Sequence, residues 1–65
     1  MKFKEGRKFR IKDSPNIADK SLVGCEGTVS FHCSYLGLDS FWGWFLWKGS
    51  MEEEAFYPED VEFLD

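Results

Sequence analysis

The sequence predicts an all-β protein in which five short strands close into a small barrel, with one short helical turn before the last strand. Apolar residues alternate with polar ones in several short runs, as in strands that bury one face, and no window sustains the period of a helix. The 65 residues include seven Phe, three Trp and two Tyr, which give so short a chain the means to build a dense core. We expect one domain over residues 1–65.

The first strand is predicted over residues 8–12. Phe9 and Ile11 alternate there with cationic residues, so we expect the two apolar side chains on the buried face and the cations in water. Residues 13–21 contain Asp, Ser, Pro and Asn and are typical of an irregular loop.

A second strand is predicted over residues 28–32, with Val29 and Phe31 facing inward. Gly24 and Gly27 precede this strand. Glycines at this spacing permit the positive φ values of a tight turn or a bulge that leads into the strand.

After a hinge at residues 35–40, the third strand is predicted over residues 41–47, which are all apolar or glycine. A run of this length that is rich in aromatic residues favours a strand over a helix. Alternation makes both faces of this strand apolar. One face would carry Phe41, Gly43, Phe45 and Trp47, and the other Trp42, Trp44 and Leu46. One face fills the core, and the other needs a separate explanation.

A turn at residues 48–50 leads to a fourth strand over residues 51–57. Residues 58–60 (Pro-Glu-Asp) are expected to form a single helical turn, because Pro suits the first helical position and acidic residues suit the positive end of the helix dipole. Residues 61–64 form the last strand. The core is expected to contain Phe9, Phe31, Phe45, Trp47 and Phe56.

Charge is distributed unevenly along the chain, whose formal net charge is -4. Residues 1–12 carry six basic side chains against Glu5, whereas residues 49–65 carry seven acidic side chains and no basic one. Ends of opposite sign suit two strands that lie side by side in one sheet. The alternative interpretation is that both segments are solvated edges that keep the protein in solution.

Several short runs resemble the SH3-like barrel superfamily. They are Arg7-Lys8-Phe9-Arg10-Ile11-Lys12, Gly24-Cys25-Glu26-Gly27-Thr28-Val29, Phe45-Leu46-Trp47 and Phe56-Tyr57-Pro58-Glu59-Asp60-Val61-Glu62. The sequence is similar to the compact barrels of photosynthetic electron-transfer subunits, such as the ferredoxin-thioredoxin reductase variable chain and the photosystem I small peripheral subunit, and to KOW-type barrels. The resemblance implies a fold, and folds of this kind serve many unrelated functions.

The peptide-binding SH3 domains of signalling proteins dock polyproline ligands with an aromatic strand and an acidic loop. Residues 9–21 contain no Tyr or Trp and few acids, so a polyproline groove of the usual layout is not expected. A smaller aromatic slot between Trp44 and Tyr57 is the remaining hypothesis for such a site.

The first functional hypothesis is a non-enzymatic module that binds a protein through the outward face of residues 41–47. Trp42, Trp44 and Leu46 would form an apolar patch there, and Trp dominates the energetics of many interfaces. The alternative is that the loops at 13–22 or 33–40 cover this face as a second small core.

A related hypothesis uses the acidic end of the chain as a docking surface for a basic partner. The protein would then act as an electron-transfer or regulatory subunit, or as a small inhibitor that mimics nucleic acid. Its candidate contact residues are Glu53, Glu54, Glu59 and Asp60.

A competing hypothesis is nucleic-acid binding through the basic first strand, as KOW-type barrels suggest. Lys8, Arg10 and Lys12 share one face of that strand. The net charge of -4 disfavours this hypothesis, because acidic residues repel phosphate.

No catalytic residue, metal ligand or cofactor is predicted. A barrel this small leaves little interior for an active site. Cys25, His32 and Cys33 are one ligand short of a closed zinc site, and two half-buried thiols are the simpler interpretation. A disulfide between the cysteines would require their segments to pair closely.

The sequence shows no secretory signal and no apolar stretch long enough for a membrane helix. We therefore expect a cytoplasmic protein without a membrane partner. It would bind another protein as a monomer or as a homodimer.

Overall fold

A computed structural model describes residues 5–35 and 38–64 of the protein, with side chains for all of these except 32–35 and 38. In chain order its elements are β1 (Lys8–Ile11), η1 (Lys20–Leu22), β2 (Glu26–Tyr35), β3 (Leu38–Trp47), β4 (Ser50–Phe56), η2 (Pro58–Asp60) and β5 (Val61–Phe63), where η marks a 3-10 helix. The predicted all-β fold of five strands, with one helical turn before the last, is confirmed. No helix in the described part is long and apolar enough to cross a bilayer.

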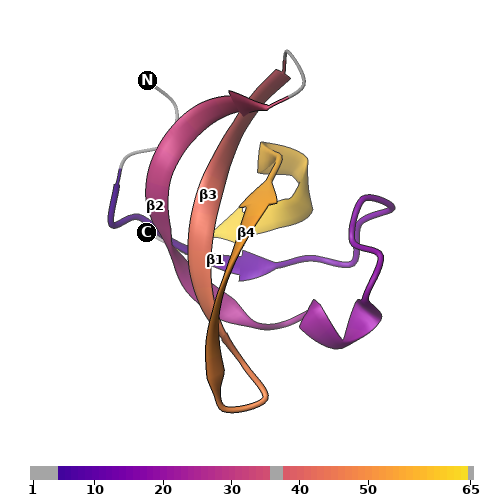
Figure 1. The fold of residues 1–65 in the computed structure, drawn as a ribbon. Coiled ribbons are helices and arrows are strands. Elements are labelled where there is room, and N and C mark those ends of the chain that lie inside the picture. Colours follow the sequence, from indigo (N-terminus) through magenta and orange to yellow (C-terminus); the bar gives the residue numbers. More distant parts are fainter. Residues whose placement is uncertain (1–4, 36–37, 65) are drawn as a thin grey trace.

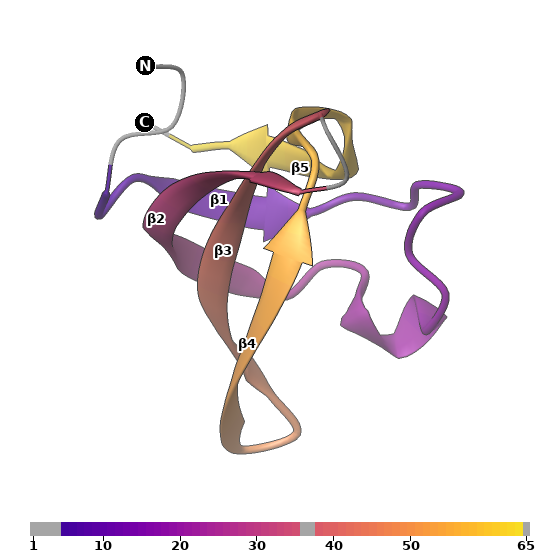
Figure 2. The same ribbon diagram turned by 45° about the horizontal axis from the view of Figure 1, so that its top comes forward.

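The five strands form one antiparallel sheet in the order β4-β3-β2-β1-β5. The sheet is strongly curled, so that β1 and β5 lie behind β2 and β3 (Figures 1 and 2). β1 pairs with β5, and Arg10 lies opposite Glu62. The expectation that the basic start and the acidic end of the chain lie side by side is therefore confirmed.

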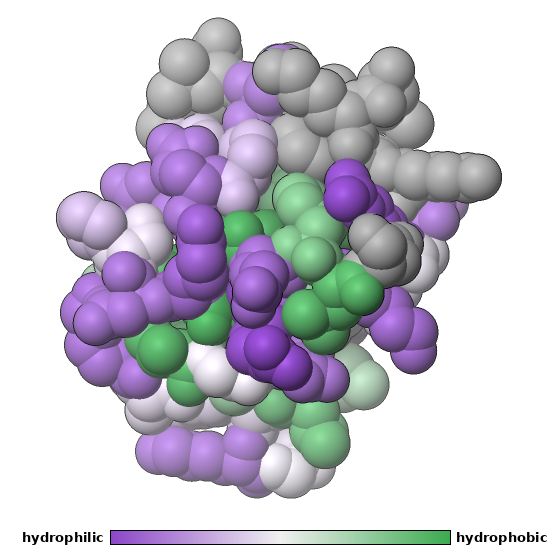
Figure 3. Space-filling view, turned by 180° about the vertical axis from the view of Figure 1, so that it is seen from behind, coloured by the Kyte–Doolittle hydropathy of each residue, from purple (hydrophilic) through white to green (hydrophobic). Residues whose placement is uncertain are grey.

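The face that carries β1 and β5 mixes hydrophilic with hydrophobic side chains (Figure 3). The hydrophobic core lies inside the curl. Its buried residues are Phe9, Ile11, Ile17, Val29, Phe41, Phe45, Phe56 and Val61.

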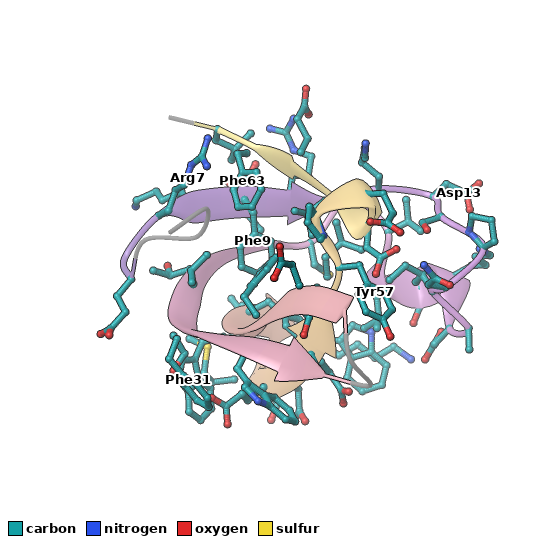
Figure 4. All side chains as sticks on the ribbon, turned by 90° about the horizontal axis from the view of Figure 1, so that it is seen from above. Arg7, Phe9, Asp13, Phe31, Tyr57 and Phe63 are labelled. Atoms are coloured by element: carbon teal, nitrogen blue, oxygen red, sulfur yellow. The ribbon has the colours of Figure 1, made fainter. Side chains whose placement is uncertain are left out.

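Phe9 is the centre of this core and is 0% exposed (Figure 4). Its ring packs at 5.4 Å from the ring of Phe41 and 5.5 Å from that of Phe56, measured between centroids. Gly43 makes this position possible, because a Cβ there would lie only 2.6 Å from Phe9 Cζ. A side chain at position 43 would displace the ring from the core.

Two members of the predicted core differ in the structure. Trp47 is only half-buried, and Phe31, predicted to face inward with Val29, is 45% exposed on the outside of the sheet. The cause is a β-bulge: Val29 lies opposite Gly43 and Phe31 lies opposite Trp42, which leaves Ser30 as an extra residue. An extra residue reverses the alternation beyond it, so Phe31 points outward and its prediction is wrong.

The β2–β3 hairpin is longer than predicted, since β2 extends to Tyr35 and β3 begins at Leu38. Polar residues near the end of the hairpin interrupt the apolar pattern, so the pattern did not predict the outer parts of the two strands. At the other end of β3, Lys48 and Gly49 connect Trp47 to Ser50 with φ values of 51° and 78°. Two successive positive φ values are typical of the tight turns that join antiparallel strands.

The 3-10 helix η1, which was not predicted, lies where the sequence predicted only an irregular loop. The Asp19 carboxylate accepts hydrogen bonds from Ser21 N at 3.0 Å and Ser21 Oγ at 2.7 Å, which stabilises this short turn. Leu22 at its end packs against the core. The loop is thus fixed to the inside of the sheet.

Candidate functional site

Apolar side chains gather on the outside of the curled sheet over β2, β3 and β4. We call this surface the outer face, and it consists of Phe31 from β2, Trp42, Trp44 and Leu46 from β3, and Met51 from β4. Phe31, Trp44, Leu46 and Met51 expose 45%, 44%, 56% and 60% of their surface, and Trp42 is half-buried. Contiguous exposed apolar side chains of this size mark interaction sites.

The outer face exists because β3 is apolar on both sides. Phe41 and Phe45 lie on the same side of the strand, are 0% and 1% exposed, and fill the core. Trp44 and Leu46 therefore point away from the core, because successive side chains of a strand point to opposite faces. The predicted assignment of these residues to two faces is confirmed.

Register brings the members of the outer face into contact across strands. Phe31 lies opposite Trp42, and their ring centroids are 6.2 Å apart with the rings tilted by 32°. Leu46 lies opposite Met51 at the other end of the face. Phe31 points away from Phe9 and from the interior of the molecule (Figure 4).

The loop at residues 13–22 does not cover the outer face. Its Ile17 is 6% exposed and belongs to the core, and Ser21 Oγ accepts a hydrogen bond from Trp47 Nε1 at 3.0 Å. Trp47 lies two residues after the inward Phe45 and therefore shares its face, so the loop packs against the inner side of β3. The alternative in which this loop buries the outer face is therefore wrong. The second loop named for that role, 33–40, lies partly outside the described residues.

Charged side chains of opposite sign border the outer face. Trp44 lies between Thr28 of β2 and Glu53 of β4, and Thr28 in turn lies opposite Lys8 of β1. Residues opposite each other in a sheet share a face, so Glu53 borders the apolar surface on one side and Lys8 on the other.

The basic strand is partly neutralised by its neighbours. Arg10 donates to Glu26 at 2.8 Å and to Glu62 at 3.3 Å. The hydrogen bond and charge of Glu26, followed by the charge of Glu62, raise the pKa of the exposed Arg10 guanidinium. Lys8 of β1 and Lys12, the residue that follows this strand, are both exposed.

The predicted acidic contact residues lie in different places. Glu53 borders the outer face, Glu54 lines a groove on the inner side of β4, and Glu59 is exposed on η2. Asp60 is 2% exposed, and this burial removes it from the acidic surface. The sequence suggested one acidic patch, and the structure divides it among separate surfaces.

Asp60 instead connects the loop after β1 to η2. Its carboxylate accepts hydrogen bonds from Ser14 Oγ at 2.7 Å, Asn16 Nδ2 at 3.0 Å and the backbone N of Tyr57 at 3.0 Å. Three donors satisfy a buried carboxylate, so Asp60 stabilises the fold. The Pro-Glu-Asp motif contains a weak signal for this role, because an acid at the third position often accepts a bond from the residue before the turn.

Tyr57 is half-buried at the end of β4. The small cavity that it lines, about 60 Å³, also includes Ser40, Ala55 and Phe56. Trp44 is not among the residues that line this cavity. The structure therefore does not bring Trp44 and Tyr57 together as an aromatic slot at this position.

Side chains that support metal or covalent chemistry are sparse in the described part of the chain. Cys25 is a half-buried free thiol, with its Sγ 4.0 Å from the carbonyl oxygen of Ser21. No cluster of three His, Cys, Asp or Glu side chains is positioned to hold a metal ion within the residues described. The side chains of His32 and Cys33 lie outside that part.

No family model matches the chain, and no curated protein or solved structure matches it either.

Proposed function

We propose that this protein is a non-enzymatic module that binds another protein through its outer face. One observation carries the proposal: four large apolar side chains, each between 44% and 60% exposed, share one face of the sheet over β2, β3 and β4. Removing apolar surface from water is favourable by about 25 cal/mol per Å², which offsets the entropy lost on association, and clustered aromatic residues contribute most to such interfaces.

Rigidity strengthens this proposal. Trp44 and Leu46 lie on a ten-residue strand whose opposite side, with Phe41 and Phe45, is fixed in the core. A backbone that is already fixed in a regular strand loses little further conformational entropy on binding, so more of the contact energy contributes to affinity.

Charges at the border give the proposed contact an orientation. Lys8 and Glu53 flank the apolar surface on opposite sides, so a partner with the complementary order of charges would be favoured over its reverse. A second copy of this chain, turned by a two-fold rotation, has that order and is one partner that the experiments below distinguish.

Nucleic-acid binding through β1 is less well supported. Arg10, the central cation of that strand, is held by two carboxylates that a phosphate would have to displace. The acidic net charge of -4 acts in the same direction.

The proposal retains two expectations from the sequence. The SH3-like barrel remains the expected fold family, and the five strands, with a loop after β1 and a turn before β5, are compatible with it. A cytoplasmic location suits the free thiol of Cys25.

The experiment compares two apolar substitutions by affinity capture from a lysate of the source cells and by sedimentation of the purified protein. Trp44→Ala removes the centre of the outer face, and Val23→Ser removes an apolar side chain that is 37% exposed outside this face. The proposal expects the captured partner, or self-association, to be retained by Val23→Ser and lost from Trp44→Ala. Thermal unfolding of both variants provides the control for folding. Loss of stability in Trp44→Ala with unchanged association would refute the proposal.

A further inference from the structure

A groove of about 360 Å³ lies on the inner side of β4, between that strand and the loop that carries η1. This loop extends to the same side of the sheet as β4 (Figures 1 and 2). The groove is separate from the outer face. Its lining residues are Asn16, Ile17, Ala18, Asp19, Leu22, Phe45, Trp47, Glu52, Glu54, Ala55 and Phe56.

The lining combines an apolar floor with acidic walls. Ile17, Phe45 and Phe56 are the buried part of that floor, and Leu22 and Trp47 are half-buried beside them. Asp19, Glu52 and Glu54 supply three carboxylates, and no basic side chain is among the described residues that line the groove. An apolar cavity bordered by charges of one sign fits a ligand that joins an apolar stem to a charge of the opposite sign.

Register explains why two of these carboxylates enter the groove. Glu52 lies opposite Phe45 and Glu54 lies opposite Gly43, so both share the inner side of the sheet. Glu53, between them, lies opposite Trp44 and points to the outer face. The three consecutive glutamates are thus divided between the groove and the outer face.

The three carboxylates are available to a cation. The pKa of Asp19 is lowered, chiefly by its hydrogen bonds from the side chain and backbone of Ser21, so this group is ionised at neutral pH. Within the residues described, no ion pair neutralises Glu52 or Glu54.

The protein's own Lys48 provides an independent observation of how a cation fits here. Its Nζ lies 4.7 Å from the centroid of the Trp47 ring, one of the groove's lining residues. The charge of Lys48 also contributes to the lowered pKa of Asp19. The ring of Trp47, one of the groove's lining residues, therefore already has an ammonium group against it.

We propose that this groove binds an arginine or lysine side chain of a protein partner. The alkyl stem would lie on Phe45, Trp47 and Phe56, and the charged head would face Glu52, Glu54 and Asp19. This site takes a basic partner segment, whereas the outer face takes apolar surface. The groove proposal does not depend on the proposed function of the outer face, so either one can be wrong without affecting the other.

The three tryptophans allow one experiment to separate the two sites. In a proton–nitrogen NMR spectrum of the full chain, the indole signal of Trp47 reports on the groove, and those of Trp42 and Trp44 report on the outer face. The probe is the blocked tripeptide acetyl-Leu-Arg-Leu-amide. Its analogue with citrulline in place of arginine keeps the shape and loses the charge. We expect the arginine peptide to shift the Trp47 indole signal and the amides of residues 52–56. The citrulline peptide should bind at least about fivefold more weakly.

Matched variants test the role of the carboxylates. Glu52→Gln and Glu54→Gln should each weaken binding of the arginine peptide by about three- to fivefold. Glu53→Gln changes the net charge equally on the opposite face and should leave the affinity within about twofold. Gln is nearly the same size as Glu and relieves repulsion among acids, so we expect all three variants to fold, as their spectra will show.

Three results with the peptides and variants would overturn the proposal. They are an unshifted Trp47 signal with the arginine peptide, equal binding of the citrulline peptide, and equal weakening by Glu53→Gln. Spermidine provides a further arm, because a free polyamine offers the same cationic and alkyl chemistry. If spermidine bound as tightly as the peptide, the groove would be a polyamine site and the proposed protein partner would be wrong.

Discussion

The buried carboxylate of Asp60 accepts a hydrogen bond from Ser14 Oγ at 2.7 Å, which joins the loop after β1 to the turn before β5. Asn16 Nδ2 and the backbone N of Tyr57 donate to the same carboxylate. Next to it, Lys12 N donates to the Asp60 carbonyl oxygen at 2.9 Å. One residue therefore fixes the position of the loop that forms one wall of the acidic groove.

We predict that Asp60→Ala lowers the free energy of unfolding by about 2–4 kcal/mol, because it leaves three donors without their acceptor in a buried site. Urea denaturation measures this loss. Glu59→Ala is the matched control, since Glu59 is an exposed acid in the same turn and should change stability by less than about 0.5 kcal/mol. Equal effects of the two substitutions would contradict the structural role of Asp60.

The second prediction concerns Phe31 and the bulge that turns it outward. Phe31→Ala should lower the free energy of unfolding by less than about 1 kcal/mol, because Phe31 is already 45% exposed and its ring contact among the described residues is with Trp42. Phe45→Ala, which removes a ring that is 1% exposed, should lower it by about 3–5 kcal/mol. Chemical denaturation of both variants tests this contrast. A loss for Phe31→Ala as large as that for Phe45→Ala would show that Phe31 is a core residue.

The different outcomes for these two phenylalanines show what the sequence could predict. On β3 the alternation has no interruption, so the division of residues 41–47 into two faces could be predicted. On β2 the bulge at Ser30 reverses the alternation, and a serine within a strand gives no signal of one. The side on which Phe31 lies is determined by the pairing of Val29 with Gly43 and of Phe31 with Trp42. This pairing between strands cannot be predicted from the residues of β2 alone.

Long-range contacts also explain the parts of the site that the sequence did not predict. Ile17 is the one large apolar side chain within residues 13–21, so no periodicity marks it as part of the core or of the groove. The three consecutive glutamates of β4 suggested one acidic patch. Only the register with β3 places Glu52 and Glu54 in the groove and Glu53 at the outer face. Asp60 is an acid that composition alone places on the surface, and its burial depends on donors far away in the chain.

The third prediction concerns acid stability at η1. The pKa of Asp19 lies below its usual value of 3.8 in the folded protein, so near that pH the unfolded chain binds more protons than the folded one. The contribution of its charge to stability is therefore fully present above the unfolded pKa and is lost as the pH falls through the folded pKa. The stability difference between the wild type and Asp19→Asn should be constant from pH 5 to 7 and shift against the wild type below about pH 4. Denaturation at a series of pH values tests this, and a difference that does not vary with pH would contradict it.

The fourth prediction uses Lys48, whose ammonium group lies 4.7 Å from the ring centroid of Trp47, a residue that lines the groove. Lys48→Met keeps an unbranched apolar stem and removes a cation that would repel and compete with an incoming arginine. We expect acetyl-Leu-Arg-Leu-amide to bind this variant about two- to fivefold more tightly than the wild type, as measured by the shift of the Trp47 indole signal. Lys8→Met changes the net charge equally on the outside of the sheet. An equal gain from that control would mean that net charge, rather than the cation at Trp47, limits access to the groove.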